Sequence, residues 1–347
     1  MTLEELVRPN ILNLSPYTCA RNEFTGEARA WLDANENSRI TGLNRYPDPL
    51  QTKVKEQLGK YRNVSPERIF LGVGSDECID IAYRVFCRPG IDNVVAIEPT
   101  YGMYQVCADI NDIEYRRVSL RKDFSLDSEA LLSACDNNTK IIWICTPNNP
   151  TGNAFSREQL CDICNRFNGI TVIDEAYIDF STKGSMTEYL DSFPNLIVMQ
   201  TFSKAWASAA IRLGISYASS SIIDIYNKVK YPYNINELTQ RQALKVLDDI
   251  THIEETTQEI LDARDNLITE LETIDNIVLG IYPSDANFIL VKVTEADAIY
   301  NYLRDCGVIV RNRSRVHLCG NCLRITVGNT EENRLLIDKL SDYGNNR

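Results

Sequence analysis

The sequence lacks the long apolar runs that a membrane-spanning helix needs. No stretch of roughly 18 consecutive apolar residues occurs in the 347-residue chain. The N-terminal segment, MTLEELVRPNILNL, also lacks the basic stretch followed by an apolar stretch that is typical of a secretory signal peptide. We therefore expect neither a transmembrane helix nor a signal peptide, and we predict a cytoplasmic protein with no membrane partner.

Positive charge is scarce relative to negative charge. The chain carries 36 lysine and arginine residues against 48 aspartate and glutamate residues, which gives a formal net charge of -12. Nucleic acid and anionic lipid are polyanions, and proteins that bind them usually present an excess of positive charge. We therefore expect no nucleic-acid partner, although a local basic pocket for a small phosphorylated molecule is compatible with this charge.

The 11 cysteines do not follow a spacing that predicts a disulfide framework or a compact zinc site. Two C-x-x-C pairs occur, Cys161 with Cys164 and Cys319 with Cys322, and together they offer the four thiolates of a zinc centre. About 155 residues separate the two pairs, however, which is far more than compact zinc modules use. We therefore favour reduced thiols and expect no metal.

Apolar runs alternate with amphipathic stretches through the first two thirds of the chain. The runs are short and bounded by turn residues, which is typical of buried strands, and helical periodicity lies between several of them. Alternating strands and helices predict a mostly parallel sheet with helices on both faces. The predicted strands are 68–73, 93–98, 140–145, 170–174, 196–201 and 212–218, and the predicted helices are 76–87, 101–110 and 156–167.

The pattern changes after residue 235. A long amphipathic helical region follows, with a break near Asp249, and then short strands alternate with two helices. This order predicts a smaller α+β domain. We assign residues 46–235 to a large α/β domain, and residues 1–45 and 236–347 to the small domain; the expected small-domain strands are 288–293, 308–312 and 323–328, and the helices are 296–307 and 331–343.

Polar residues follow several of the predicted strands, at the sheet edge where parallel α/β proteins bind ligands. Gly74-Ser75-Asp76 comes after the first strand and opens a helix, so its N–H groups can hold a phosphate, or its side chains can simply cap the helix. Asn149 follows the third strand in a loop that two prolines and a glycine fix; an ordinary turn is the alternative interpretation.

The next two strand ends carry an acid and a lysine. Asp174 ends an apolar strand, where a buried carboxylate needs a cationic partner unless it only caps a turn. Lys204 follows the next strand among small and aromatic residues, where burial lowers an amine pKa and makes the amine nucleophilic; a solvated loop residue is the alternative. Arg212 lies eight residues further on and is a candidate anion ligand.

The ordered set of these residues resembles the fold-type I aminotransferases of the aspartate aminotransferase superfamily, which use pyridoxal 5′-phosphate (PLP). The segments PNNPTG and DEAYIDF carry the resemblance, and it extends over essentially the whole chain. The chain is most similar to histidinol-phosphate aminotransferases, through LSPY, WLDANEN, NRYPDP, GVGSDE, EPTYGMY and CLRITVGNTEEN. One segment departs: SKAWASAAIR has serine and alanine where the family usually has glycines, but the spacing from the lysine to the arginine is kept.

The resemblance implies a role for each of these residues. Lys204 would carry PLP as a Schiff base and act as the general acid and base, and Asp174 would pair with the pyridinium nitrogen. The other implied cofactor contacts are Asn149 and Tyr177 on the phenolic oxygen, Tyr101 on the ring face, and Ser75, Asp76, Ser203 and Arg212 on the phosphate. Tyr46 resembles a tyrosine that reaches the phosphate from the neighbouring subunit, so the resemblance also implies a homodimer.

For the substrate, the resemblance implies two arginines and an entry tyrosine. Arg324 would bind a carboxylate, Arg311 would be a second anion ligand, and Tyr17 would help to close the site, with Asn149 also in contact with substrate. A surface position in a basic patch with Arg313 and Arg315 is the alternative for Arg311. The implied reaction converts L-histidinol phosphate and 2-oxoglutarate into imidazole-acetol phosphate and L-glutamate, in histidine biosynthesis. An aromatic or other amino-acid aminotransferase, a threonine-phosphate decarboxylase and a non-catalytic PLP-binding protein are the alternatives.

Overall fold

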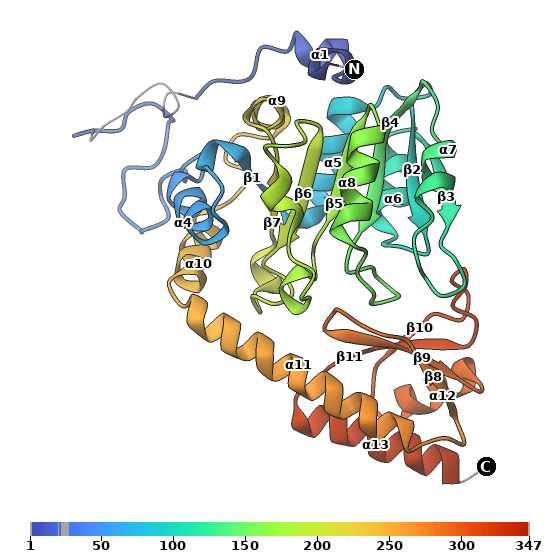
Figure 1. Ribbon diagram of the computed structural model, residues 1–347. Helices are drawn as coiled ribbons and strands as arrows, with labels where there is room; N and C mark the ends of the chain where they lie inside the picture. The colour runs from blue at the N-terminus through green and yellow to red at the C-terminus, as the bar shows by residue number, and fades with distance from the viewer. Residues whose placement is uncertain (1, 20, 22–27, 346–347) are drawn as a thin grey trace.

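The computed structural model describes residues 2–19, 21 and 28–345. A large domain contains a seven-stranded sheet, and a smaller domain contains a four-stranded sheet (Figure 1). The long helix α11 (Ile250–Glu272) extends from the large domain along the smaller one (Figure 1). The fold is therefore the α/β fold with an added α+β domain that the sequence predicts.

The large sheet has the strand order β1-β7-β6-β5-β4-β2-β3. Only β7 runs antiparallel to its neighbours among the described strands, so the sheet is mostly parallel. Its central strands are buried on both faces, which explains their continuous apolar sequences. The strands are β1 (Ile69–Val73), β2 (Asn93–Glu98), β3 (Glu114–Ser119), β4 (Thr139–Cys145), β5 (Ile170–Asp174), β6 (Leu196–Thr201) and β7 (Leu213–Tyr217).

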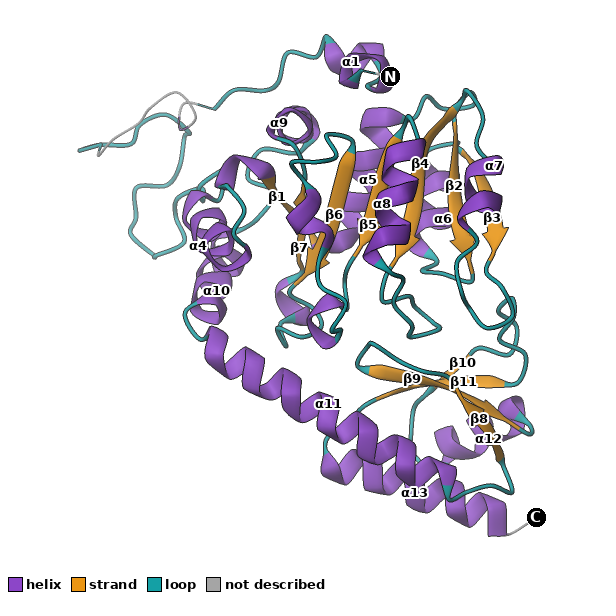
Figure 2. Ribbon diagram, in the orientation of Figure 1, coloured by secondary structure: helices purple, strands orange, loops and turns teal. Residues whose placement is uncertain are grey.

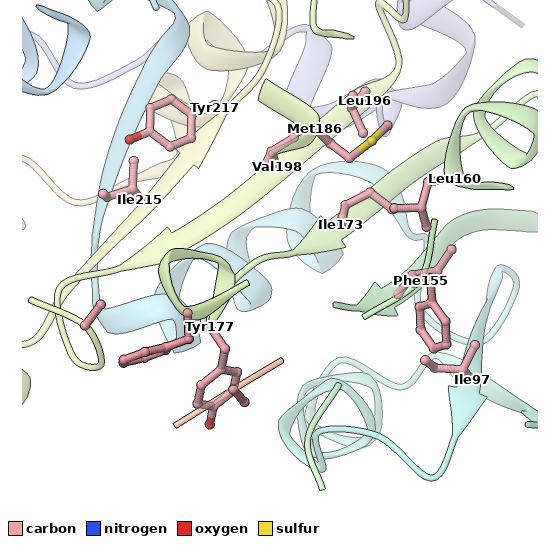
Figure 3. Packing of buried hydrophobic residues seen from close by; sticks show 14 of the residues in the cluster. Ile97, Phe155, Leu160, Ile173, Tyr177, Met186, Leu196, Val198, Ile215 and Tyr217 are labelled. Carbon is pink, nitrogen blue, oxygen red and sulfur yellow. The ribbon is translucent and has the colours of Figure 1, made fainter. Parts of the chain in front are cut away.

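Helices cover both faces of this sheet (Figure 2). Alternate residues of one strand supply the two cores: Trp143 of β4 faces one and Ile144 the other. One core includes α5 (Gly74–Phe86), α6 (Met103–Ile110) and α9 (Ser220–Val229). The other includes α4 (Thr52–Arg62), α7 (Ser128–Ser133), α8 (Arg157–Arg166) and α10 (Glu237–Leu247), and Figure 3 shows part of it, with Leu160 of α8 beside Ile173 of β5.

The smaller domain has its own core beneath an antiparallel sheet of order β10-β11-β9-β8. Apolar residues of α11, α12 (Ala296–Asp305) and α13 (Thr330–Asn345) pack against one face of that sheet. The strands are β8 (Val278–Ile281), β9 (Phe288–Val293), β10 (Arg311–Asn312) and β11 (Cys322–Thr326). Among the described residues, no helix is both long and apolar enough to span a bilayer.

The six strands and three helices expected between residues 64 and 215 are present, and the helical region after residue 235 breaks at Asp249 as expected. Strand β3 was not foreseen, because it lies at the sheet edge and its sequence, EYRRVS, contains no apolar run. Strand β8 was not foreseen either, and the strand expected at 308–312 is reduced to the two residues of β10. Short single-turn 3-10 helices lie at Pro66–Arg68, Ile178–Phe180, Met186–Tyr189 and Ala209–Ile211.

The N-terminal helices differ from the expectation that residues 1–45 pack with the small domain. Helices α1 (Leu3–Leu6) and α2 (Pro9–Leu12) lie against the large domain, at its edge away from the small one (Figure 1). Leu6, Val7 and Ile11 share the core of α5 and α9, and the N–H of Arg8 donates to the carbonyl of Val85 at 2.9 Å. Burial of Leu6 of α1, of Val7 directly after it and of Ile11 of α2 in this core explains the placement.

Candidate active site

A cavity of about 660 Å³ lies between the two domains, at the carboxyl ends of the central parallel strands. Ligands bind at this edge in open α/β sheets, because loops and helix N-termini converge there. Eleven of the thirteen residues that the sequence nominates line it: Ser75, Asp76, Tyr101, Asn149, Asp174, Tyr177, Ser203, Lys204, Arg212, Arg311 and Arg324.

Asp174 is the last residue of β5 and is almost completely buried. The hydroxyl of Tyr104 donates to its Oδ2 at 2.5 Å, and the N–H of Ala176 donates to its Oδ1 at 3.1 Å. Burial raises the pKa of this carboxyl, and the two hydrogen bonds and the charge of Lys204 oppose that shift. A cationic group placed beside Asp174 therefore stabilises the carboxylate.

Lys204 lies in the turn after β6, and that turn directs its amine into the cavity. Its Nζ is 5.5 Å from the ring centroid of Tyr177. Burial lowers the pKa of Lys204, and the charge of Arg324 lowers it further, whereas Asp174 raises it. A lowered pKa increases the fraction of neutral amine, which is the nucleophilic form.

The N-terminus of α5 closes one end of the cavity. Gly74 has a φ of +70° and its N–H donates to the carbonyl of Arg212 at 2.8 Å; a Cβ on this glycine would lie 2.5 Å from the Arg212 guanidinium. Asp76 accepts from Arg212 at 3.4 Å and from the hydroxyl of Tyr101 at 3.2 Å. The first turn of a helix has N–H groups without intrahelical partners, so this corner can bind a phosphate.

The other end of the cavity is formed by the small domain. Nη1 of Arg324 donates to Oδ1 of Asn149 at 2.5 Å, which joins β11 to the loop after β4. Arg311 of β10 is the register partner of Arg324 in the antiparallel pair, so both residues lie on the same face of the sheet. Arg311 is exposed and also lines an outer groove with Arg313 and Arg315, so its anion-binding role stays a prediction.

Two nominated residues do not line this cavity. The side chain of Tyr17 is 75% exposed, and that of Tyr46 is 51% exposed and stacks on Tyr233 with 4.5 Å between ring centroids. The contact of Tyr46 with a neighbouring subunit stays a prediction.

Two residues of the site were missed by the sequence analysis. Tyr104 holds Asp174, and it stands in the segment EPTYGMY, which was quoted for the resemblance without a role for this tyrosine. Arg313 lines the cavity although it was counted with a surface patch. Its position two residues after Arg311 on an extended strand was the available signal, because such residues share a face.

The C-x-x-C pairs lie away from this cavity. Cys319 and Cys322 are buried against Tyr282 near the turn before β11, and Cys164 is buried on α8. Within the part of the chain that the structure describes, no group of three or more His, Cys, Asp or Glu residues could hold a metal ion.

Comparison with known proteins agrees with this geometry. The model of the family "Aminotransferase class I and II" matches residues 9–340. The chain belongs to this family. Two histidinol-phosphate aminotransferases, from Bacteroides fragilis (strain YCH46) and Bacteroides thetaiotaomicron, are 52% and 53% identical to it over 343 residues, which cover 99% of this aminotransferase and 99% of each relative.

Solved structures share the fold of this aminotransferase. The histidinol-phosphate aminotransferase from Clostridium acetobutylicum superimposes with a TM-score of 0.81 at 23% identity, over 89% of this chain and 93% of that one. The corresponding enzyme from Sinorhizobium meliloti, in complex with pyridoxal-5′-phosphate, also gives 0.81 at 23% identity, over 88% and 84%. The threonine-phosphate decarboxylase from Porphyromonas gingivalis gives 0.73 at 21%, over 87% and 91%.

The family implies PLP, and the residues of the cavity fit this cofactor. PLP presents a pyridinium nitrogen, an aldehyde and a phosphate, which need a carboxylate, an amine and an anion site respectively. The buried Asp174, the Lys204 amine with its lowered pKa, and the Arg212 corner at the start of α5 supply these three groups around one cavity.

Proposed function

We propose that this aminotransferase transfers the amino group of L-histidinol phosphate to 2-oxoglutarate, which gives imidazole-acetol phosphate and L-glutamate in histidine biosynthesis. The supporting observation is the match, at 52–53% identity and over 99% of the chain, to histidinol-phosphate aminotransferases. The site adds physical support: arginines of the small domain line the same cavity as Lys204, so an anionic amino donor can bind beside the reacting amine.

Residues of the large domain would hold PLP. The free N–H groups of Ser75 and Asp76, with Ser203 and Arg212, would bind the phosphate, and Asp174 would pair with the ring nitrogen. Asn149 and Tyr177 would hydrogen-bond the phenolic oxygen, and Tyr101 would lie against the ring face. When bound, PLP supplies the electron sink for the bond cleaved at the substrate Cα.

Lys204 would move the proton in the reaction. Its Nζ would take the proton from the substrate Cα and return it at C4′ of the cofactor, so it must be neutral before the transfer. Burial and the charge of Arg324 favour that neutral form by lowering the pKa of Lys204. Asp174 would stay ionised beside the pyridinium nitrogen, and Tyr104 holds it in place through the 2.5 Å hydrogen bond.

Arg311 and Arg324 would bind the anionic groups of the two substrates in turn. Histidinol phosphate carries a phosphate, and glutamate carries two carboxylates, so the same guanidinium groups must accept both. Tyr17 would cover the site after the substrate enters.

A homodimer is part of this proposal. Tyr46 would reach the cofactor phosphate of the partner subunit, since it does not line the cavity of its own chain. The segment before it is rich in exposed apolar side chains: Leu32 is 93%, Ile40 91% and Leu43 54% exposed. Apolar surface of this kind typically marks a protein contact. Eleven free cysteines further support a reducing, cytoplasmic location.

The absorbance of the PLP-loaded protein tests the function directly. Addition of histidinol phosphate without any 2-oxo acid should convert the spectrum of the bound aldehyde cofactor into that of its amine form. Addition of 2-oxoglutarate should then restore the first spectrum, with one glutamate formed per site. A protein that ignores histidinol phosphate but responds to another amino acid would be a different aminotransferase, and release of carbon dioxide would indicate a decarboxylase.

A further inference from the structure

The small-domain wall of the cavity holds one arginine more than the roles above use. Arg311, Arg313 and Arg324 all line the cavity. The N–H of Arg313 donates to the carbonyl of Cys322 at 2.9 Å, which continues the pairing of Arg311 with Arg324 by two residues. Side chains two residues apart on an extended strand share a face, so Arg311 and Arg313 face the cavity together.

These arginines have no acidic partner. Among the described residues, none of the three forms an ion pair with a carboxylate, and no side-chain hydrogen bond of Arg313 is present. Nε of Arg313 and Nε of Arg324 are both buried without a hydrogen-bond partner. Burial lowers the pKa of Arg313, and the neighbouring Arg324 and Arg311 lower it further. Like charges that the protein itself leaves uncompensated are stabilised when an anion binds.

The two carboxylates that line the cavity, Asp76 and Asp174, form hydrogen bonds with residues of the large domain and not with the small-domain arginines. Asp76 contacts Arg212 and Tyr101, and Asp174 contacts Tyr104, all on the large-domain side. Of the residues that the structure describes, five cationic side chains but only these two carboxylates line the cavity. The excess of positive charge is therefore concentrated at the small-domain wall, where the substrate would bind.

We propose that Arg313 is a specificity-determining residue that, together with Arg311, binds the dianionic phosphate monoester of the amino donor. This inference rests on the proposed function. Arg324 already donates to Asn149 at the cofactor end of the cavity, which leaves Arg311 and Arg313 as two free guanidinium groups on one face. A phosphate has three acceptor oxygens and can engage both forks, whereas a carboxylate has two and is satisfied by one fork.

Arg315 provides a matched control for Arg313. It belongs to the same loop and is exposed. It lines an adjoining outer groove together with Arg311 and Arg313 but, unlike them, it does not line the cavity. Arg313→Gln and Arg315→Gln remove the same charge from the same segment. Only Arg313→Gln should weaken the binding of histidinol phosphate more than the binding of glutamate.

The experiment measures the two half-reactions separately, with the absorbance of the PLP-loaded enzyme. Arg313→Gln should raise the apparent Kd for histidinol phosphate about 10- to 100-fold, the usual effect of losing a hydrogen bond to a charged group. The apparent Kd for glutamate should change less than about threefold, and Arg315→Gln should change either Kd less than about twofold. Arg313→Lys, which keeps the charge but loses the planar fork, should recover part of the loss.

Inorganic phosphate gives a second measurement that does not depend on the donor. In competition with glutamate, phosphate should bind the unaltered enzyme about tenfold more tightly than it binds Arg313→Gln. It should bind Arg315→Gln as tightly as the unaltered enzyme. The role of Arg313 is overturned if Arg313→Gln loses the same affinity for histidinol phosphate and for glutamate. It is also overturned if this variant loses no affinity for histidinol phosphate or for inorganic phosphate. If the unaltered enzyme does not react with histidinol phosphate, the proposed function fails, and the phosphate competition still decides whether Arg313 binds phosphate.

Discussion

The two walls of the active-site cavity are built differently. On the large-domain wall, formed by Asp76, Tyr101, Asp174, Lys204 and Arg212, acids and cations contact one another or a tyrosine. On the small-domain wall, formed by Arg311, Arg313 and Arg324, the described residues offer no carboxylate partner. A resident cofactor can share a site that is already balanced, whereas a substrate that comes and goes must itself supply the missing charge.

Removal of the Lys204 amine should have the largest effect on activity. Lys204→Ala removes the proton carrier, so turnover should fall by about 10³-fold or more, because general acid–base catalysis contributes up to about 10⁴-fold. Single-turnover absorbance with histidinol phosphate measures it. Lys183→Ala, at an exposed loop position, is the control and should behave as the unaltered enzyme. Full turnover by Lys204→Ala would place the chemistry elsewhere.

A paired and an unpaired arginine should differ in their effect on stability. Arg62 is half-buried, with 15% of its side chain exposed, and pairs with Asp179 at 2.6 Å, so Arg62→Gln should lower the unfolding free energy by about 1.5–3 kcal/mol. Arg324→Gln should cause no such loss without substrate, because it relieves repulsion, yet it should lower kcat/KM about 10- to 100-fold. Denaturant unfolding of the substrate-free proteins compares them; equal losses would refute the contrast between the walls.

The acid next to Asp174 should make stability depend on pH. Glu175 is buried and accepts from the N–H of Met186, the hydroxyl of Ser185 and the amide of Gln200, but burial dominates and raises its pKa from 4.5 to about 7. The folded protein therefore binds this proton more tightly than the unfolded chain does. The stability that results is fully present below pH 4.5 and is lost as the pH rises to about 7.

Comparison of Glu175→Gln with the unaltered protein isolates this effect. Between pH 4.5 and pH 8 the unaltered protein should lose about 3 kcal/mol of unfolding free energy relative to the variant, since each pKa unit corresponds to about 1.4 kcal/mol. The exposed Glu188→Gln should follow the unaltered protein at every pH. A constant difference between Glu175→Gln and the unaltered protein over this range would show that Glu175 stays ionised.

The smallest effect is expected at Trp206, in the segment SKAWASAAIR. Its indole N–H donates to Oδ2 of Asp179 at 2.8 Å, and this bond joins the Lys204 turn to the segment that carries Tyr177. Trp206→Phe keeps an aromatic ring but removes the donor, so unfolding free energy should fall by about 1–2 kcal/mol. Thermal unfolding of the PLP-loaded protein measures it, and an unchanged midpoint would show that the bond contributes nothing.

The sequence by itself determined six of the seven strands of the large sheet and the place of Asp174 and Lys204 at one edge of it. Asp174 and Lys204 each end or follow an apolar strand, and a parallel sheet brings the carboxyl ends of its strands to one edge, so local pattern and general topology sufficed. Edge strand β3 was not predicted, because an exposed strand needs no apolar run. Helices α1 and α2 were assigned to the wrong domain, because their few apolar residues do not reveal which surface buries them.

Only the tertiary structure decided which arginines belong to the site. The family resemblance distinguishes Arg311 in the sequence, but Arg313 and Arg315 look alike there, where each is one cation in a polar segment. In the structure Arg311 and Arg313 line the cavity that contains Lys204, whereas Arg315 lines only the adjoining outer groove. That selection depends on the register of β10 against β11 and on the packing of the small domain against the large one, whose Lys204 lies more than 100 residues away in the chain, and no local pattern encodes it.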